Sequence, residues 1–226
     1  QLLKLGADPD WADYDAVTPL HAACTAGDQH LAKALLAAKA SLNAFAGPRA
    51  ESPLHAAARC NHAAVVSALL ALGADSQSRD DAGYTVLGAA AAAGAADSID
   101  ELFPAGLDAD GAAAPDGATS LHIAARHGQE RAVEALVRGG ADVDATDDAG
   151  ATPLHAAAAA STFEAATSAA SSLIRHSAAA DARDHLGRTP LHLALGAQNF
   201  SLARELLSNG ARADILAPDG ASPLWM

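Results

Sequence analysis

A four-residue phrase returns along the whole chain at nearly constant spacing, and this feature constrains the fold more than any other. The phrase begins with Thr or Ser, usually continues with Pro and Leu, and ends with His in five of its seven copies. Successive copies start 34, 33, 34, 33, 37 and 33 residues apart. The copies begin at Thr18, Ser52, Thr85, Thr119, Thr152, Thr189 and Ser222. A fixed period of this size predicts an array of similar structural units.

A second phrase, Gly-Ala-Asp or a close variant, keeps the same period and confirms the register of the first. It follows the phrase start by 21 residues at Gly73, Gly140 and Gly210. We therefore interpret residues 1–226 as a single repeat domain with a partial repeat at 1–17 and another at 222–226. The six whole repeats span 18–51, 52–84, 85–118, 119–151, 152–188 and 189–221. Because both ends cut a repeat, we expect the chain to be a fragment of a longer protein.

The residue types within one repeat predict a pair of helices. The hydroxyl of Thr or Ser caps the first free amides of a helix, and Pro fits the next position, where no amide hydrogen is needed. Nine residues after the start, Gly27 and its equivalents, or Asn61, supply the left-handed conformation that ends a helix. Apolar residues at helical spacing, such as Val133 and Leu136, then mark a second helix.

Connectors rich in Asp and Gly, such as 80–83 and 147–150, have the composition of hairpin turns, and we expect them to project as fingers.

The phrase T-P-L-H-x-A, the leucine pair and G-A-D at a 33-residue period together resemble the ankyrin repeat. The resemblance spans the whole chain. It implies an all-α, ankyrin-repeat solenoid of stacked helix-turn-helix units with β-hairpin-like finger loops.

Repeat 85–118 departs from this pattern, since its phrase lacks both Pro and His. Pro104 is expected to end its second helix early. We expect Ile99, Leu102 and Phe103 to keep the repeat packed. Two interpretations stay open: sequence drift in a tolerant array, and a functional hinge.

Repeat 152–188 carries four extra residues between Ser161 and Ser172. Four residues amount to about one helical turn, so they fit either a longer helix or a longer loop between the helices. Their Ser and Thr content favours the loop.

In another repeat, 18–51, Lys39 occupies the position that is usually glycine. The end of that helix is therefore expected to be strained or shaped differently.

The chain has ten histidines, which raises the question of metal binding or catalysis. Five of them close the repeated phrase, where the ankyrin resemblance implies that the ring bridges backbone groups of adjacent repeats. Cys60 and His62 supply only half of the ligands that a structural zinc needs. Motifs for zinc hydrolysis, serine nucleophiles and phosphate binding are all absent. We therefore expect no enzymatic activity, no metal and no cofactor.

The chain carries 27 acidic and 14 basic residues, a formal charge of −13, which argues against nucleic acid or anionic lipid as a partner. No stretch of eighteen strongly apolar residues exists, so no membrane insertion is expected. Cys24 and Cys60 are too few for a disulfide framework and are typical of free thiols in a reducing compartment. We expect a cytoplasmic protein, without excluding the nucleus.

Partner binding is the function that this architecture favours, because stacked repeats offer a long preorganised surface whose residues vary without disturbing the core. The ankyrin resemblance implies contacts from the finger tips and from the exposed face of the first helix. We expect a monomeric, non-catalytic scaffold that binds a protein or peptide there. Finger aspartates would steer a basic segment toward this surface, although aspartate is also ordinary turn chemistry. The candidate partner-binding residues are Arg59, His62, Asp81, Tyr84, Arg126, His127, Asp148 and Arg188, to which we add Phe45 and Arg49.

Two alternatives remain. The chain would fit the substrate-targeting arm of a larger multidomain enzyme, such as a ubiquitin-ligase adaptor or a kinase, with the catalytic module outside residues 1–226. Asn43, which lies in a connector, would also fit the substrate of an asparaginyl hydroxylase, as the resemblance to other ankyrin connectors permits.

Overall fold

The computed structural model describes residues 6–160 and 163–216 as helices joined by turns and loops. Each repeat holds two helices, and the second helix always begins eleven residues after the capping Thr or Ser. The first helices are α1 (Pro19–Ala26), α3 (Pro53–Arg59), α5 (Val86–Ala93), α7 (Ser120–Arg126), α9 (Pro153–Ala158) and α11 (Pro190–Gly196). The second helices are α2 (Gln29–Ala37), α4 (Ala63–Ala71), α6 (Ala96–Leu102), α8 (Glu130–Arg138), α10 (Phe163–Arg175) and α12 (Phe200–Ser208). The predicted all-α fold is confirmed.

The fingers are hairpin-like, as predicted. Three of them carry an isolated antiparallel bridge, and the bridges join Ala46 to Glu51, Arg79 to Thr85 and Ala112 to Thr119. None of the helices in the described part of the chain combines the length and the apolar character that a membrane crossing requires.

The helices begin and end where the capping signals predict. Thr18 and Ser52 have extended backbones, and their hydroxyls accept hydrogen bonds from the amides three residues later. Asn61 takes the left-handed conformation, with φ 59°, that ends α3. Lys39, in the glycine position after α2, is left-handed as well, with φ 68°. A side chain with a Cβ is strained in this region, so the expectation of a strained helix end at Lys39 is confirmed.

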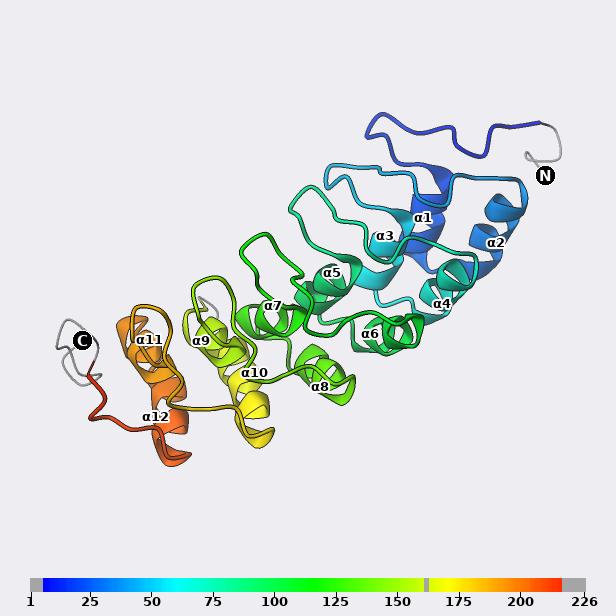
Figure 1. Ribbon diagram of the computed structural model, residues 1–226. Coiled ribbons are helices and arrows are strands. Elements are labelled where there is room, and N and C mark those ends of the chain that lie inside the picture. The colour runs from blue at the N-terminus through cyan, green and yellow to red at the C-terminus, as the bar shows by residue number, and fades with distance from the viewer. Residues whose placement is uncertain (1–5, 161–162, 217–226) are drawn as a thin grey trace. The chain divides into compact units, whose positions relative to one another are not determined.

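The helices form two compact units. The first consists of the described residues within 1–90 and 95–108, and the second of those within 91–94 and 109–226. In the first unit, α1 packs on α2 and α3, α3 packs on α4, and α4 packs on α6 (Figure 1). Leucines from successive helices are fully buried in this stack, among them Leu20, Leu54 and Leu69.

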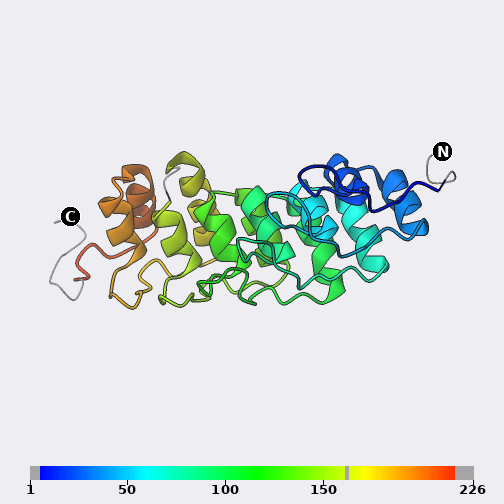
Figure 2. The ribbon, with the colours of Figure 1, turned by 90° about the horizontal axis from the view of Figure 1, so that it is seen from above.

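The second unit repeats this packing. Helix α7 packs on α8 and α9, α9 packs on α10 and α11, and α10 packs on α8 and α12 (Figure 2). Leu121, Leu136, Leu154 and Leu173 are fully buried between these helices. Each helix pair therefore buries its apolar side against the pairs next to it, which is the source of stability in repeat proteins.

Repeat 85–118 behaves as its sequence predicts. Helix α6 has seven residues where α4 and α8 have nine, and a 3₁₀ turn, η2 (Phe103–Ala105), carries Pro104 directly after it. Ile99 and Leu102 are fully buried, whereas Phe103 is only half-buried. The two apolar side chains of α6 therefore keep this shortened helix packed.

The loop predicted for the extra residues of repeat 152–188 is wrong. Helix α10 has thirteen residues, four more than α8, and it begins at the usual offset from its capping Thr. The insertion therefore adds one turn to the end of the second helix. Its buried side chains, Ala166, Ala169, Ala170 and Leu173, recur at helical spacing, and burying this stripe outweighs the weak preference of Ser and Thr for loops.

Candidate functional site

The histidines of the repeated phrase tie each repeat to the next one within a unit. The Nε2 atom of each ring donates to the backbone carbonyl of the residue just before the next capping Thr or Ser. The bonds join His21 to Glu51, His55 to Tyr84, His122 to Ala151 and His155 to Arg188, at 3.0, 3.2, 2.8 and 2.9 Å. The bridging role that the resemblance implied is confirmed for these four rings. The corresponding carbonyl for His192, that of Ala221, lies outside the described residues.

These hydrogen bonds fix the rings in the neutral state. The backbone N–H of Thr119 donates to Nδ1 of His122 at 3.2 Å, so Nδ1 must be the acceptor and Nε2 must carry the hydrogen. Burial lowers the pKa of His21, His55, His122 and His155 from the ordinary value, and the carbonyl bonds offset this only in part. Neutral, fully engaged rings hold the repeats together and have no ring nitrogen left for other chemistry.

The two thiols differ in their surroundings. Cys24 and Cys60 are both free; Cys24 is buried, and burial raises the pKa of its thiol to about 12. Cys60, in contrast, is only half-buried. Among residues 6–160 and 163–216, no three side chains of His, Cys, Asp or Glu are grouped so that they could hold a metal ion.

Backbone hydrogen bonds near the tips link three pairs of successive fingers. The amide of Asp81 donates to the carbonyl of Arg49 at 2.9 Å in the first unit. In the second unit, the amide of Asp148 donates to Asp116 at 3.1 Å, and that of His185 donates to Ala149 at 2.9 Å. The fingers of these three pairs therefore support each other.

Four of the fingers are also closed from within by an aspartate five residues before the capping Thr. Its Oδ1 accepts the amide of the residue four positions later, at 2.8 or 2.9 Å. The aspartates in this position are Asp13, Asp80, Asp147 and Asp184. They serve as turn residues, whereas Asp81 and Asp148 expose their side chains at the tips.

Three of the four arginines proposed for partner binding, all but the exposed Arg49, form an ion pair with a carboxylate of their own unit. Arg59 forms a bidentate ion pair with Glu51, with N–O distances of 2.8 and 3.1 Å. The hydrogen bonds to Glu51 are the main reason why the pKa of Arg59 is raised. Arg126 lies 3.3 Å from Asp116, and Arg188 lies 2.7 Å from Asp184. The three guanidinium groups remain partly exposed, so they are held in place at the surface.

Asp184 is the one buried acid among these pairs in the described part of the chain. Burial acts to raise the pKa of its carboxyl, but hydrogen bonds from the side chain and amide of Arg188 and the charge of the guanidinium outweigh it. The resulting pKa is below the ordinary value. Asp184 therefore anchors both the finger turn and Arg188 as an ionised group.

The two remaining histidines of the candidate set lie in the short turns between paired helices. Nε2 of His62 bonds to the carbonyl of Thr25 at 3.0 Å, and the ring lies so close to Gly27 that a Cβ there would come within 2.5 Å of it. His62 therefore helps to pack the repeats. His127 is exposed, and its Nδ1 bonds to the carbonyl of Ile123 at 2.9 Å.

The structure reveals exposed aromatic side chains that the sequence interpretation missed. Trp11 is 77% exposed and Tyr14 is completely exposed, both in the finger that precedes α1. Phe45, in the next finger of the same unit, is 53% exposed, and Tyr84 in the third is half-buried. The repeat period alone places Trp11 and Tyr14 in a finger, so this signal was available in the partial repeat. We refer to Trp11, Tyr14, Phe45 and Tyr84 as the aromatic finger set.

The comparisons with known proteins agree with the geometry. The family model described as "Ankyrin repeats (3 copies)" matches residues 1–80, 72–147 and 121–219. The ankyrin repeat domain of Bcl-3 has a TM-score of 0.75 at 27% identity, covering 93% of this chain and 94% of that one. The human ASB11 ankyrin repeat domain has a TM-score of 0.77 at 26% identity, covering 92% and 90%.

Sequence relatives match over shorter segments. Human neurogenic locus notch homolog protein 2 is 40% identical over 126 residues, which are 56% of this chain and 5% of the relative. A Caenorhabditis elegans homolog of transient receptor potential cation channel subfamily A member 1 is 30% identical over 151 residues, 67% of this chain and 12% of the relative. The chain thus spans only a small part of these relatives. Because the family model covers most of its length, the chain belongs to the ankyrin-repeat family.

Proposed function

We propose that this chain binds a segment of a partner protein on its fingers and first helices, without catalysing a reaction. Ankyrin repeats are in general modules of protein–protein interaction. The observation that carries the proposal for this chain is the aromatic finger set, because exposed Trp and Tyr on supported loops are the side chains that most often anchor a protein interface. The fingers need little ordering on binding, since hydrogen bonds already link or close them.

The partner segment is basic. The finger before α1 holds Asp8, Asp10, Asp13 and Asp15 around its two aromatic side chains and contains no Lys or Arg. A Lys or Arg side chain of the partner would gain both from these carboxylates and from the face of Trp11. Polar contacts to the partner would come from the other candidate residues of both units. These residues are Arg59, His62 and Asp81 in the first unit and Arg126, His127, Asp148 and Arg188 in the second. The chain acts as a monomer in the cytoplasm.

The test selects peptides that bind the whole chain from a peptide-display library, and it compares the net charge of the selected peptides with that of the library. Basic peptides should be enriched, and the double variant Trp11→Ala/Tyr14→Ala should bind them about tenfold more weakly or worse. Phe200→Ala is the matched control, because Phe200 is 68% exposed on a second helix, away from the fingers. Equal binding by the double variant, or an equal loss in the control, would remove the aromatic finger set from the binding surface.

A second arrangement follows from the lengths of the relatives. Since the matched segments are 5% and 12% of those proteins, repeats of this kind occur within much longer chains. The present chain would then be the targeting arm of a larger protein, including an enzyme such as a ubiquitin-ligase adaptor or a kinase. The sequence of the full-length gene decides between the two arrangements.

Asn43 is exposed, and its Oδ1 accepts the amide of Asp75 at 3.0 Å. Its use as a substrate of an asparaginyl hydroxylase stays a prediction, checked by a mass increase of one oxygen on the peptide that contains it.

A further inference from the structure

One second helix of the first unit has an outer face unlike that of the others. Helix α4 reads AAVVSALLA and has no charged residue, whereas every other second helix in the described part of the chain has at least one. Helix α8 has four: Glu130, Arg131, Glu134 and Arg138. A helix that is apolar all round is normally buried on all sides. Yet Ala64, Ser67 and Ala71 of α4 are exposed, and Leu72 at its end is 55% exposed.

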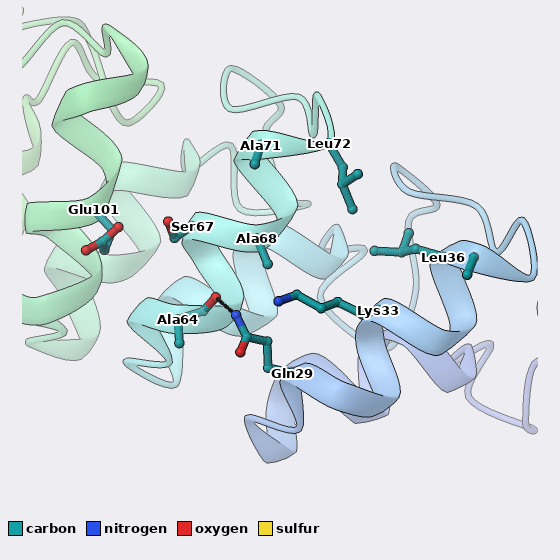
Figure 3. Close-up of a pocket in the computed structure, with 10 residues that line it drawn as sticks. Gln29, Lys33, Leu36, Ala64, Ser67, Ala68, Ala71, Leu72 and Glu101 are labelled. Carbon is teal, nitrogen blue, oxygen red and sulfur yellow. Dashed lines mark hydrogen bonds between the residues drawn. The ribbon is translucent and has the colours of Figure 1, made fainter.

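The small side chains of α4 form the floor of an open groove of about 860 Å³. Figure 3 shows α4 between its neighbours, with Lys33 of α2 extending toward it from one side and Glu101 of α6 on the other. Gln29 closes one end, where its Nε2 donates to the carbonyl of Ala64 at 2.9 Å. Leu36 and Leu72 line the other end. All these residues belong to the first unit, and none is on a finger or a first helix.

The two walls of the groove have opposite charges, and neither charge has an ion-pair partner in the described part of the chain. No residue in 6–160 or 163–216 forms an ion pair with Lys33 or Glu101. In contrast, Glu130 and Glu134 of α8 share Arg175 of α10 at 2.9 and 3.1 Å. The groove therefore combines an apolar floor with one free cation and one free anion.

We propose that this groove binds an amphipathic helix of another protein, with an apolar stripe flanked by a carboxylate for Lys33 and a base for Glu101. The occupant is a helix because the backbone groups of α4 are already used within the helix, so an extended strand would find no hydrogen bonds there. Alanine also allows two helix axes to approach closely. The nine residues of α4 span about 14 Å, which is the length of about two and a half turns of the partner helix.

The test measures binding of a stapled helical peptide of about 15 residues, with a leucine stripe and with Glu on one flank and Arg on the other, to the whole chain. Ala71→Arg should weaken this binding about tenfold or more, because it places a charge on the apolar floor. Ala34→Arg is the matched control: Ala34 is also an exposed alanine of a second helix, but it lies outside the groove. Arginine has nearly the helix propensity of alanine, so both variants should fold, as their melting temperatures will show.

Charge reversal tests the recognition itself. In Lys33→Glu both walls are acidic, so a peptide with Arg on both flanks should bind about threefold better than the mixed peptide, whichever way the helix runs. Equal losses in Ala71→Arg and Ala34→Arg, no change of preference in Lys33→Glu, or no binding at about 1 mM peptide would overturn the proposal. Self-association that Ala71→Arg abolishes would assign the groove to a second copy of the chain and would overturn it too. Because these variants leave the fingers intact, their outcome is independent of the proposed finger surface.

Discussion

Repeats 52–84 and 119–151 have nearly the same interior and very different exteriors. Both begin with a capping box, and both use the histidine of the phrase to hold the next repeat. Both bury a leucine at the same position of the second helix, Leu69 in α4 and Leu136 in α8. Outside, α4 is free of charge, whereas α8 has four charged residues. The interior is thus set by the demands of stacking, and the exterior is free to carry binding properties.

The largest effect should come from the shared interior. Leu69→Ala and Leu136→Ala should each lower the free energy of unfolding by roughly 2–5 kcal/mol, because each leaves a cavity between packed helices. Chemical denaturation of the two variants measures this loss. Similar losses would show that the two interiors are equivalent, and wild-type stability of either variant would contradict the burial of its leucine.

The second prediction concerns the buried histidines and pH. Since burial lowers the pKa of His122 in the folded state, the folded protein binds fewer protons than the unfolded chain once the pH falls below about 6.5. The stabilisation is therefore present above this pH and is lost as the pH falls toward the folded-state pKa. Each such ring should contribute up to about 1.4 kcal/mol per pH unit, and His21, His55 and His155 should behave alike.

His122→Gln should cost roughly 1–3 kcal/mol at neutral pH, because it breaks a buried hydrogen-bond network, and it should reduce the loss between pH 7 and pH 5. His127→Gln is the control, since His127 is exposed. Asp116, Arg126 and Asp147 also influence the pKa of His122, so the comparison is made at one salt concentration. An unchanged acid dependence in His122→Gln would show that the ring is protonated without penalty.

The sequence predicted the interior well because its signals are local. The capping Thr or Ser, the proline after it and the left-handed Asn61 act within one turn of a helix, so their residue types are enough to place them. The spatial role of the histidines also followed, through the ankyrin resemblance. Repeat 85–118 shows that the histidine is not required for packing. It has Gly88 in place of His, yet Ile99 and Leu102 keep α6 packed.

The exterior was harder to predict, since it depends on which side chains of different repeats reach each other. The ion pairs of Arg59, Arg126 and Arg188 join residues four to ten positions apart that only the folded finger brings together. The groove on α4 requires the neighbouring helices as walls. The extra turn of α10 was misjudged because Ser and Thr occur in loops and helices alike, and only the buried alanine stripe decides between them.

The smallest effect should come from the charged exterior of α8. Arg175 bridges Glu130 and Glu134, but its side chain is 54% exposed and the pair is screened by water and salt. Arg175→Ala should therefore change the melting temperature only slightly, and the change should shrink further at high salt. A large loss of stability would mean that the ion pairs of α8 are needed to stabilise the fold, although the outer face of α4 has no charged residue. In that case the lack of charge on α4 would need a structural explanation, and the comparison of the two exteriors would no longer point to binding.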